Sequence, residues 1–274
     1  MRAALLQMTA GIDPAENART IVAAVEAASA EGAAMLFTPE MSGLVDRDRA
    51  RAATHIVDER DDRVLAATRE AAARAGVWVH LGSLAVAGAD GRHANRGFVI
   101  DGAGEVRARY DKLHLFDVDL PDGESWRESA AYAPGTRAVT VDTPLGRLGL
   151  SICYDLRFAD LYRALSDAGA TVLAVPAAFT VPTGEAHWHV LLRARAIEAG
   201  AYVVAAAQAG THADGRRTYG HSLAVDPWGD VLCDMAVETG VSFFAIDPAR
   251  VADVRARIPA IAHRRAIPPV EHVR

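Results

Sequence analysis

The sequence predicts an α/β protein in which mixed β-sheets are covered by helices. Apolar runs of strand length alternate with helical patterns along all 274 residues. Three pairs of apolar runs are joined by short turns rich in Asp, Pro and Gly, at residues 101–104, 142–146 and 226–229, which is typical of β-hairpins. Hairpins produce antiparallel pairs, so the pattern favours mixed sheets over a purely parallel, doubly wound one.

The first part of the chain contains clear helix boundaries. Asp13 can cap a helix that begins with Pro14, and a second amphipathic helix is closed by Gly76. The expected elements are a strand at 2–8, a helix from 14 to about 32, a strand at 34–38, a helix at 61–75 and a strand at 77–84.

The remaining elements follow the same alternation. They are strands at 105–110 and 147–152, a helix at 158–168, a strand at 170–175, a helix at 186–199, and strands at 201–207 and 241–246. Residues 111–137 show no periodicity, yet they carry large side chains such as Trp126 and Tyr132. Connections of this length are uncommon and usually functional, so we expect a structured active-site loop.

Composition restricts the class of protein. Hydrophobic residues make up 51% and charged residues 23%, which is typical of a globular chain, and we expect a single domain over 1–274. The net charge of −6, without a basic stripe, argues against nucleic acid or a membrane surface as a partner. No apolar run reaches membrane length, the N-terminus does not resemble a signal peptide, and two distant cysteines suit a reducing compartment. A cytoplasmic location is therefore expected.

Lysine usage is unusual. Of 29 basic residues only Lys112 is a lysine, so the other 28 are arginines. An ammonium is a compact point charge and a guanidinium a wide planar fork, so a lone lysine indicates a position that arginine cannot fill. The alternative is a surface lysine retained by chance.

Three chemically capable residues follow the ends of expected strands: Glu40, Lys112 and Cys153. Polar groups beyond strand carboxyl ends gather in one crevice of a sheet-based enzyme. If Cys153 begins a helix, the helix dipole and a nearby ammonium would lower the pKa of its thiol. A buried, unreactive cysteine is the alternative. Cys233 lies in a hairpin strand and is expected to be structural, and the i, i+2 spacing of His187 and His189 argues against a metal pair.

These residues and their contexts carry a resemblance to a known family. Glu40 in FTPEMSG, Lys112 in YDKLHLF and Cys153 in SICYDLRF resemble the Glu–Lys–Cys triad of the nitrilase (carbon–nitrogen hydrolase) superfamily. Glu128 in WRESAAYAPG matches a second glutamate that members place beside the lysine. The stretches TGEAHWHVLLRARAIEAGAYVVAAAQAG and YGHSLAVDPWGDV resemble the branch that contains deaminated glutathione amidase and ω-amidase. Glu185 and His189 depart from the pattern of that branch.

The resemblance implies a four-layer αββα sandwich and a homodimer or higher homo-oligomer that needs no cofactor or metal. It also implies hydrolysis of an amide to a carboxylate and ammonia, with Cys153 as nucleophile, Lys112 and the Tyr154 backbone N–H at the oxyanion, and Glu40 moving protons. Deaminated glutathione is the favoured substrate. The alternatives are an ω-amidase acting on α-ketoglutaramate, another amidase, N-carbamoyl or nitrile hydrolase, and an inactive binding scaffold.

Three further residues are candidates for substrate binding. Arg157 lies one helical turn after Cys153 and could bind the carboxylate of a small amide substrate bidentately. Phe179 and Thr183 could supply a wall and a hydroxyl from the loop after the strand at 170–175. The alternative for Arg157 is an ion pair with Asp155, Asp160 or another loop acid.

Overall fold

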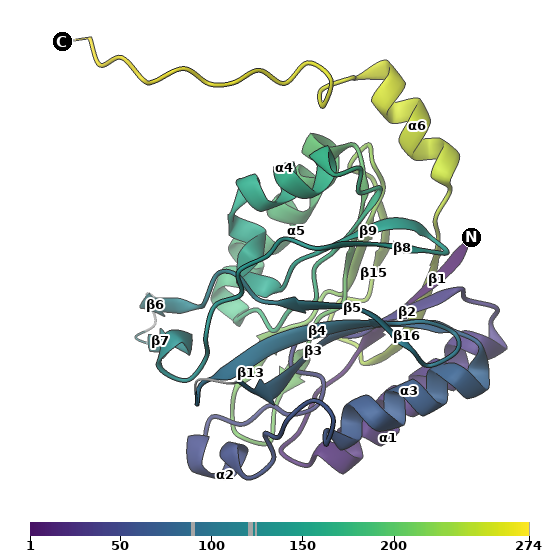
Figure 1. Ribbon diagram of the computed structural model, residues 1–274, viewed down its shortest axis with the longest axis vertical. Helices are drawn as coiled ribbons and strands as arrows, with labels where there is room; N and C mark the ends of the chain where they lie inside the picture. The colour runs from purple at the N-terminus through teal and green to yellow at the C-terminus, as the bar shows by residue number, and fades with distance from the viewer. Residues whose placement is uncertain (89–90, 120–122, 124, 274) are drawn as a thin grey trace.

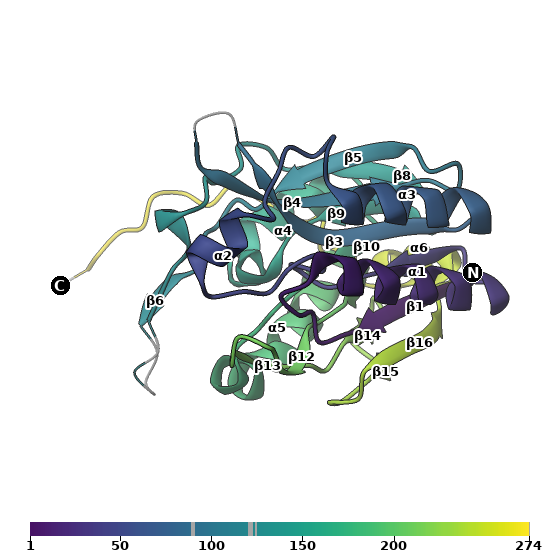
Figure 2. The same ribbon diagram turned by 90° about the horizontal axis from the view of Figure 1, so that it is seen from below.

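Two six-stranded mixed sheets pack face to face, and helices cover the outer side of each (Figure 1). This computed structural model describes residues 1–88, 91–119, 123 and 125–273. In Figure 1 the two sheets lie between their helices, which makes the four-layer αββα sandwich that the resemblance implied. Figure 2 views the same stack from below, from the side of the helices that cover the first sheet. Among the described residues, no helix combines the length and apolarity needed to cross a membrane.

The first sheet has the order β16-β1-β2-β3-β4-β5. Its strands are β1 (Arg2–Gln7), β2 (Met35–Phe37), β3 (Trp78–Ala87), β4 (His93–Ile100), β5 (Val106–Asp111) and β16 (Gly240–Ala245). β1, β2 and β3 are parallel, and the other pairs are antiparallel. Two antiparallel steps separate β5 from β3, so β5 runs in the same direction as β2. Glu40 and Lys112 therefore follow strand ends at the same edge of the sheet.

The second sheet has the order β15-β14-β11-β10-β9-β8. Its strands are β8 (Thr140–Thr143), β9 (Gly146–Leu150), β10 (Val172–Ala174), β11 (Tyr202–Ala205), β14 (Leu223–Val225) and β15 (Val231–Asp234). β9, β10 and β11 are parallel, with antiparallel strands on both sides. All three predicted hairpins are present, and both sheets are mixed as expected.

The main helices are α1 (Pro14–Ala30), α2 (Arg49–Ala53), α3 (Arg63–Ala75), α4 (Ala159–Asp167), α5 (Val181–Ala199) and α6 (Pro248–Arg257). α1 and α3 pack on the first sheet, whereas α4 and α5 pack on the second. The Asp13 carboxylate accepts the Ala15 N–H as the expected cap of α1. Gly76 ends α3 in the left-handed conformation, with φ of 65°.

The core between the sheets combines apolar side chains from both inner faces, such as Leu5 and Phe37 from the first sheet and Leu148 and Leu173 from the second. A second cluster, which includes Ile21 and Val25, fills the space between the first sheet and α1 with α3. These two buried layers hold the strand ends rigidly, because protein interiors are close-packed.

Two local expectations need correction. Cys153 does not begin an α-helix: it starts the short 3₁₀ helix η2 (Cys153–Arg157), and α4 begins only at Ala159. α5 begins at Val181 instead of 186, because Pro182 suits a first helical turn, so Thr183 lies on that helix and not in a loop. The described part of the long segment after β5 is structured, as expected: it contains the paired strands β6 (Asp117–Asp119) and β7 (Ser125–Arg127), followed by η1 (Glu128–Ala130).

A second small hairpin was not predicted from the sequence either. It pairs β12 (Ala209–Thr211) with β13 (Arg217–Tyr219). Its strands have only three residues each, too few for alternation to stand out in a sequence.

Candidate active site

Lys112 lies between two carboxylates beyond the ends of β2 and β5. Its Nζ is 2.9 Å from Glu40 Oε1 and 2.9 Å from Glu128 Oε2. The lysine side chain is only 2% exposed. Burial alone would lower the pKa of Lys112, but the charges of Glu128 and Glu40 outweigh it and hold that pKa well above its ordinary value. The ammonium is therefore charged, and the cluster of one cation and two anions carries a net charge of −1.

Asn95, on β4, connects the two glutamates. Its Nδ2 donates to Glu40 Oε1 at 2.9 Å and to Glu128 Oε1 at 3.1 Å. Sequence reasoning missed this residue. The available signal was weak: asparagine is depleted in strands, so one inside the strand HANRGFVI suggests a role other than pairing.

The position of Glu40 depends on a close approach of backbones. A Cβ on Gly82 of β3 would lie 2.1 Å from the Thr38 carbonyl oxygen and 2.4 Å from that of Pro39, so only glycine admits the chain that leads to Glu40. The other carboxylate oxygen of Glu40 accepts the Ala178 N–H at 3.0 Å. Burial raises the pKa of Glu40, but Lys112 and hydrogen bonds from Cys153, Lys112 and Asn95 bring it below the ordinary value. Glu40 is therefore a carboxylate.

Cys153 adopts a strained backbone conformation. Its φ of 51° lies in the left-handed region, which costs a residue with a Cβ roughly 1–2 kcal/mol. Its N–H donates to the Pro176 carbonyl at 2.9 Å. Such strain is concentrated at functional sites, where surrounding contacts hold it.

The expected lowering of the thiol pKa is not found. Burial and the negative charge of Glu40 raise the pKa of Cys153 well above its ordinary value, and Lys112 offsets them only in part. The main cause is burial of the sulfur, and Glu40 lies beside it. The resting group is a thiol whose proton faces a carboxylate.

Asp155 fixes the turn that carries the cysteine. Its carboxylate accepts the Tyr110 hydroxyl at 2.7 Å, the Ile152 N–H at 2.9 Å and the His114 N–H at 3.0 Å. These bonds connect β5, the segment after Lys112 and the Cys153 turn. They also leave Asp155 engaged elsewhere, so the alternative ion pair between Arg157 and Asp155 is not formed.

Arg157 contacts the ring of His187, with both terminal nitrogens 3.3 Å from Nδ1. Its guanidinium lies over the rings of Phe179 and Tyr154, at 5.6 and 5.8 Å from the centroids. Among the described residues it has no carboxylate partner. The Thr183 hydroxyl lies 2.8 Å from that of Thr180, which leaves it less available to a substrate than expected.

One cavity of about 480 Å³ collects these groups. Every residue named from the sequence as a candidate for catalysis or substrate binding lines it: Glu40, Lys112, Glu128, Cys153, Tyr154, Arg157, Phe179 and Thr183. Trp126 and Tyr132 of the long segment form another part of the wall, together with Arg47 and Arg216. Cys153, the charge cluster and several cationic side chains therefore line one cavity.

Comparison with known proteins identifies the family. The model of the carbon–nitrogen hydrolase family matches residues 2–256. The chain belongs to the carbon–nitrogen hydrolase family. A relative from Yersinia enterocolitica named deaminated glutathione amidase is 39% identical over 96% of this chain and 93% of its own length.

Two solved structures support the fold of this carbon–nitrogen hydrolase. The crystal structure of the Caenorhabditis elegans NitFhit protein has a TM-score of 0.89 at 39% identity, covering 96% of this chain and 65% of that one. An amidase from Nesterenkonia, solved with acrylamide added to its active-site cysteine, has a TM-score of 0.77 at 29% identity, covering 94% and 98%.

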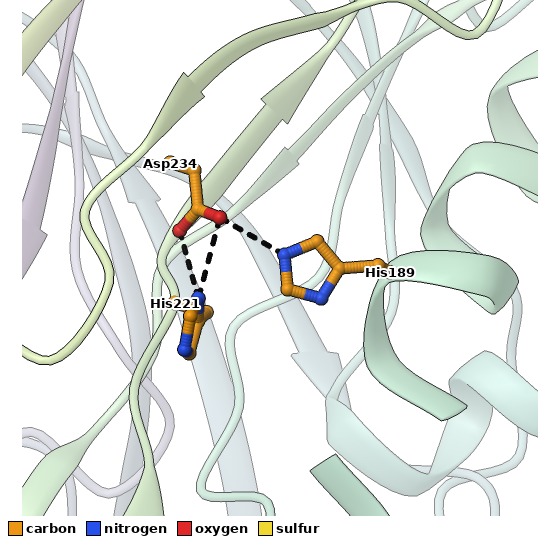
Figure 3. A group of neighbouring side chains, drawn as sticks. All are labelled: His189, His221 and Asp234. Carbon is orange, nitrogen blue, oxygen red and sulfur yellow. Dashed lines mark hydrogen bonds and ion pairs between the residues drawn. The ribbon is translucent and has the colours of Figure 1, made fainter. Parts of the chain in front are cut away.

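The two departures from the branch pattern lie outside the cavity of this carbon–nitrogen hydrolase. Glu185 is exposed on α5. His189 and His221 both contact Asp234, with nitrogen–oxygen distances of 3.0 Å (Figure 3). The ligand atoms of these three residues lie within 4.8 Å of one another, as at a cation site, but their hydrogen bonds account for the arrangement. Cys233 is half-buried, with Sγ 3.2 Å from the Ser242 hydroxyl.

Proposed function

We propose that this chain hydrolyses the amide of deaminated glutathione, with Cys153, Glu40 and Lys112 as catalytic residues. The observation that carries the proposal is the buried Lys112 ammonium held by Glu40 and Glu128 in the cavity that contains Cys153. The choice of substrate is supported by relatives at 38–40% identity that are named deaminated glutathione amidase.

The acylation step follows from the protonation states. Glu40 accepts the thiol proton as Sγ attacks the amide carbon, because an elevated thiol pKa prevents a free thiolate from forming first. The Lys112 ammonium and the Tyr154 N–H stabilise the oxyanion. Glu128, which also accepts the Phe116 N–H at 2.6 Å, keeps the ammonium in place. Glu40 then gives its proton to the departing amine, and a thioester remains on Cys153.

Deacylation returns the site to its starting state. Glu40 takes a proton from water, the hydroxide adds to the thioester carbon, and Cys153 leaves and recovers the proton. The amine released differs between the two leading substrates. α-Ketoglutaramate would release ammonia, whereas deaminated glutathione is a substituted amide and would release the dipeptide cysteinylglycine. The expectation of ammonia therefore does not apply to deaminated glutathione, although it holds for α-ketoglutaramate and for the N-carbamoyl and nitrile alternatives.

A panel of amides tests the substrate. Deaminated glutathione, α-ketoglutaramate, an N-carbamoyl amino acid and an uncharged nitrile would be compared by kcat/KM, with α-ketoglutarate measured for the first two and ammonia for the rest. We expect the highest value for deaminated glutathione. A higher value for α-ketoglutaramate would make the chain an ω-amidase and leave the catalytic residues unchanged.

An inactive scaffold is less consistent with the site. A binding protein has no use for a buried lysine between two carboxylates beside a strained cysteine, since such an arrangement costs desolvation and backbone energy. Turnover of none of the panel would favour the scaffold.

Assembly and location complete the proposal. We infer a cytoplasmic homodimer or higher homo-oligomer, supported by the family resemblance and by exposed apolar side chains on α5, where Val190 is 69% and Ile197 53% exposed.

A further inference from the structure

Besides Arg157, the cavity contains a second guanidinium, Arg216, away from the turn that carries Cys153. Arg216, just before β13, lines the same wall as Trp126, and its guanidinium carbon lies 4.5 Å from the centroid of the indole. Arg47 approaches the same ring at 6.0 Å. Trp126 comes from the long segment after β5, so three separate parts of the chain meet at this wall.

Two guanidinium groups share one carboxylate at this wall. The Oδ2 of Asp214 is 3.9 Å from Nε of both Arg47 and Arg216. The carboxylate oxygens of Asp214 accept the backbone N–H groups of Arg47 and Arg216, each at 2.8 Å. One carboxylate, already engaged by two backbone N–H groups, thus faces two guanidinium groups and lies within hydrogen-bond distance of neither Nε.

The Arg216 guanidinium is itself incompletely satisfied. Its Nε is buried and has no hydrogen-bond partner in the part of the chain that the structure describes. Burial lowers the pKa of Arg216, which reflects the same lack of compensation. Leaving a buried charged donor unpaired is costly, so the site is suited to an anion that would complete it.

The other arginines of the cavity are engaged differently. Arg127 pairs with Asp119, and Arg49 donates to the Arg127 carbonyl. Arg157 lies next to the nucleophile turn, where it contacts His187 and two aromatic rings. The cavity therefore presents two places for a carboxylate, one at Arg157 and one at Arg216.

We propose that Arg216, held on Trp126, binds a carboxylate on the leaving-group side of the amide. A guanidinium lying over an aromatic ring can still direct the N–H groups of its plane at a carboxylate and bind it with two parallel hydrogen bonds. Arg157 would take the carboxylate of the acyl group. This assignment rests on the proposed function: deaminated glutathione has a carboxylate on each side of the scissile bond, whereas α-ketoglutaramate has only the one on the acyl side.

The test compares two substrates that differ only at the terminal carboxylate of the leaving group. kcat/KM is measured for deaminated glutathione and for its analogue with the terminal carboxylate converted to a primary amide. Because hydrogen bonds to charged groups are stronger than neutral ones, wild-type enzyme should prefer the substrate with the terminal carboxylate roughly 10- to 100-fold. The preference should fall to near one in Arg216→Gln, mainly through KM, and recover partly in Arg216→Lys. Arg217→Gln, at the exposed neighbouring position, is the matched control and should keep it.

The outcomes separate the two proposals. If wild-type enzyme hydrolyses both substrates equally, or Arg216→Gln keeps the preference, the Arg216 site is wrong and the amidase assignment stands. If wild-type enzyme hydrolyses neither of these substrates nor α-ketoglutaramate, the proposed function is wrong, and the carboxylate site proposed at Arg216 is wrong as well. The wild-type substrate pair remains decisive even if the Arg216 variant does not fold.

Discussion

The space between Glu40 and Glu128 holds one small cation, the Lys112 ammonium, which contacts both carboxylates at 2.9 Å. A guanidinium in that space would displace at least one carboxylate, because it is wider and planar. We therefore expect Lys112→Arg to lower kcat by at least about 100-fold, the scale of losing one oxyanion donor. Steady-state kinetics with deaminated glutathione measure this, and a circular dichroism melting curve controls for folding. Turnover within a few-fold of wild type would mean that Lys112 has no part in the chemistry.

The protonation states of Glu40 and Cys153 determine the pH profile. Glu40 must be ionised to accept the thiol proton, and its pKa lies below the ordinary value. kcat/KM should therefore stay level as the pH falls from 8 to about 5, without the loss near pH ~6.5 that a Cys–His pair would give. A pH–rate profile over that range measures it, and an acid limb centred near neutrality would contradict the role of Glu40.

Glu40 also makes the stability of the fold depend on pH, and the direction follows from its lowered pKa. Because the pKa of Glu40 is lower in the folded than in the unfolded chain, its contribution is complete above the unfolded value of about 4.3. It is lost as the pH falls through the lower folded value. Melting temperature should thus fall more steeply with acid in the wild type than in Glu40→Gln, below about pH 5.

At the scale of elements, strand β3 sets the position of Glu40 through Gly82. A methyl group there would push the Thr38–Pro39 backbone outward, since the closest oxygen lies 2.1 Å from the added carbon. Gly82→Ala should lower kcat by about 100-fold, because misplacement by about 1 Å has that effect. Gly11→Ala, where the nearest atom lies at 4.0 Å, is the control and should behave as wild type. Equal kinetics for both variants, with matching melting curves, would show that the close approach is unimportant.

Elements with strong local signals were predictable. The caps of α1 and α3 and the three hairpins follow from Asp13, Gly76 and turn residues, because capping and turn chemistry act locally. The 3₁₀ turn at Cys153 was not, since a hydrogen bond from its N–H to the distant Pro176 and the Asp155 network decide it. Tertiary contacts likewise placed Asn95 between the glutamates and raised the thiol pKa.

The whole molecule leaves apolar side chains uncovered on α5. Val190 and Ile197 are too exposed to belong to the core, and their helix lies on the outer face of the second sheet. We expect light scattering to give about 58 kDa or a higher multiple, from 29.1 kDa per chain, and Val190→Asp to shift the mass toward the monomer. A wild-type mass near that of one chain at micromolar concentration would contradict the homo-oligomer.

Residues that follow strands of both sheets line one cavity, and there we propose Cys153 as the nucleophile. The most direct test is the release of α-ketoglutarate from deaminated glutathione by Cys153→Ala. The variant should melt like wild type and still bind the substrate in calorimetry, because the neighbouring charges and both arginine sites remain. It should release product no faster than the buffer blank. Turnover by the alanine variant at a rate comparable to wild type would contradict the role of Cys153 as nucleophile.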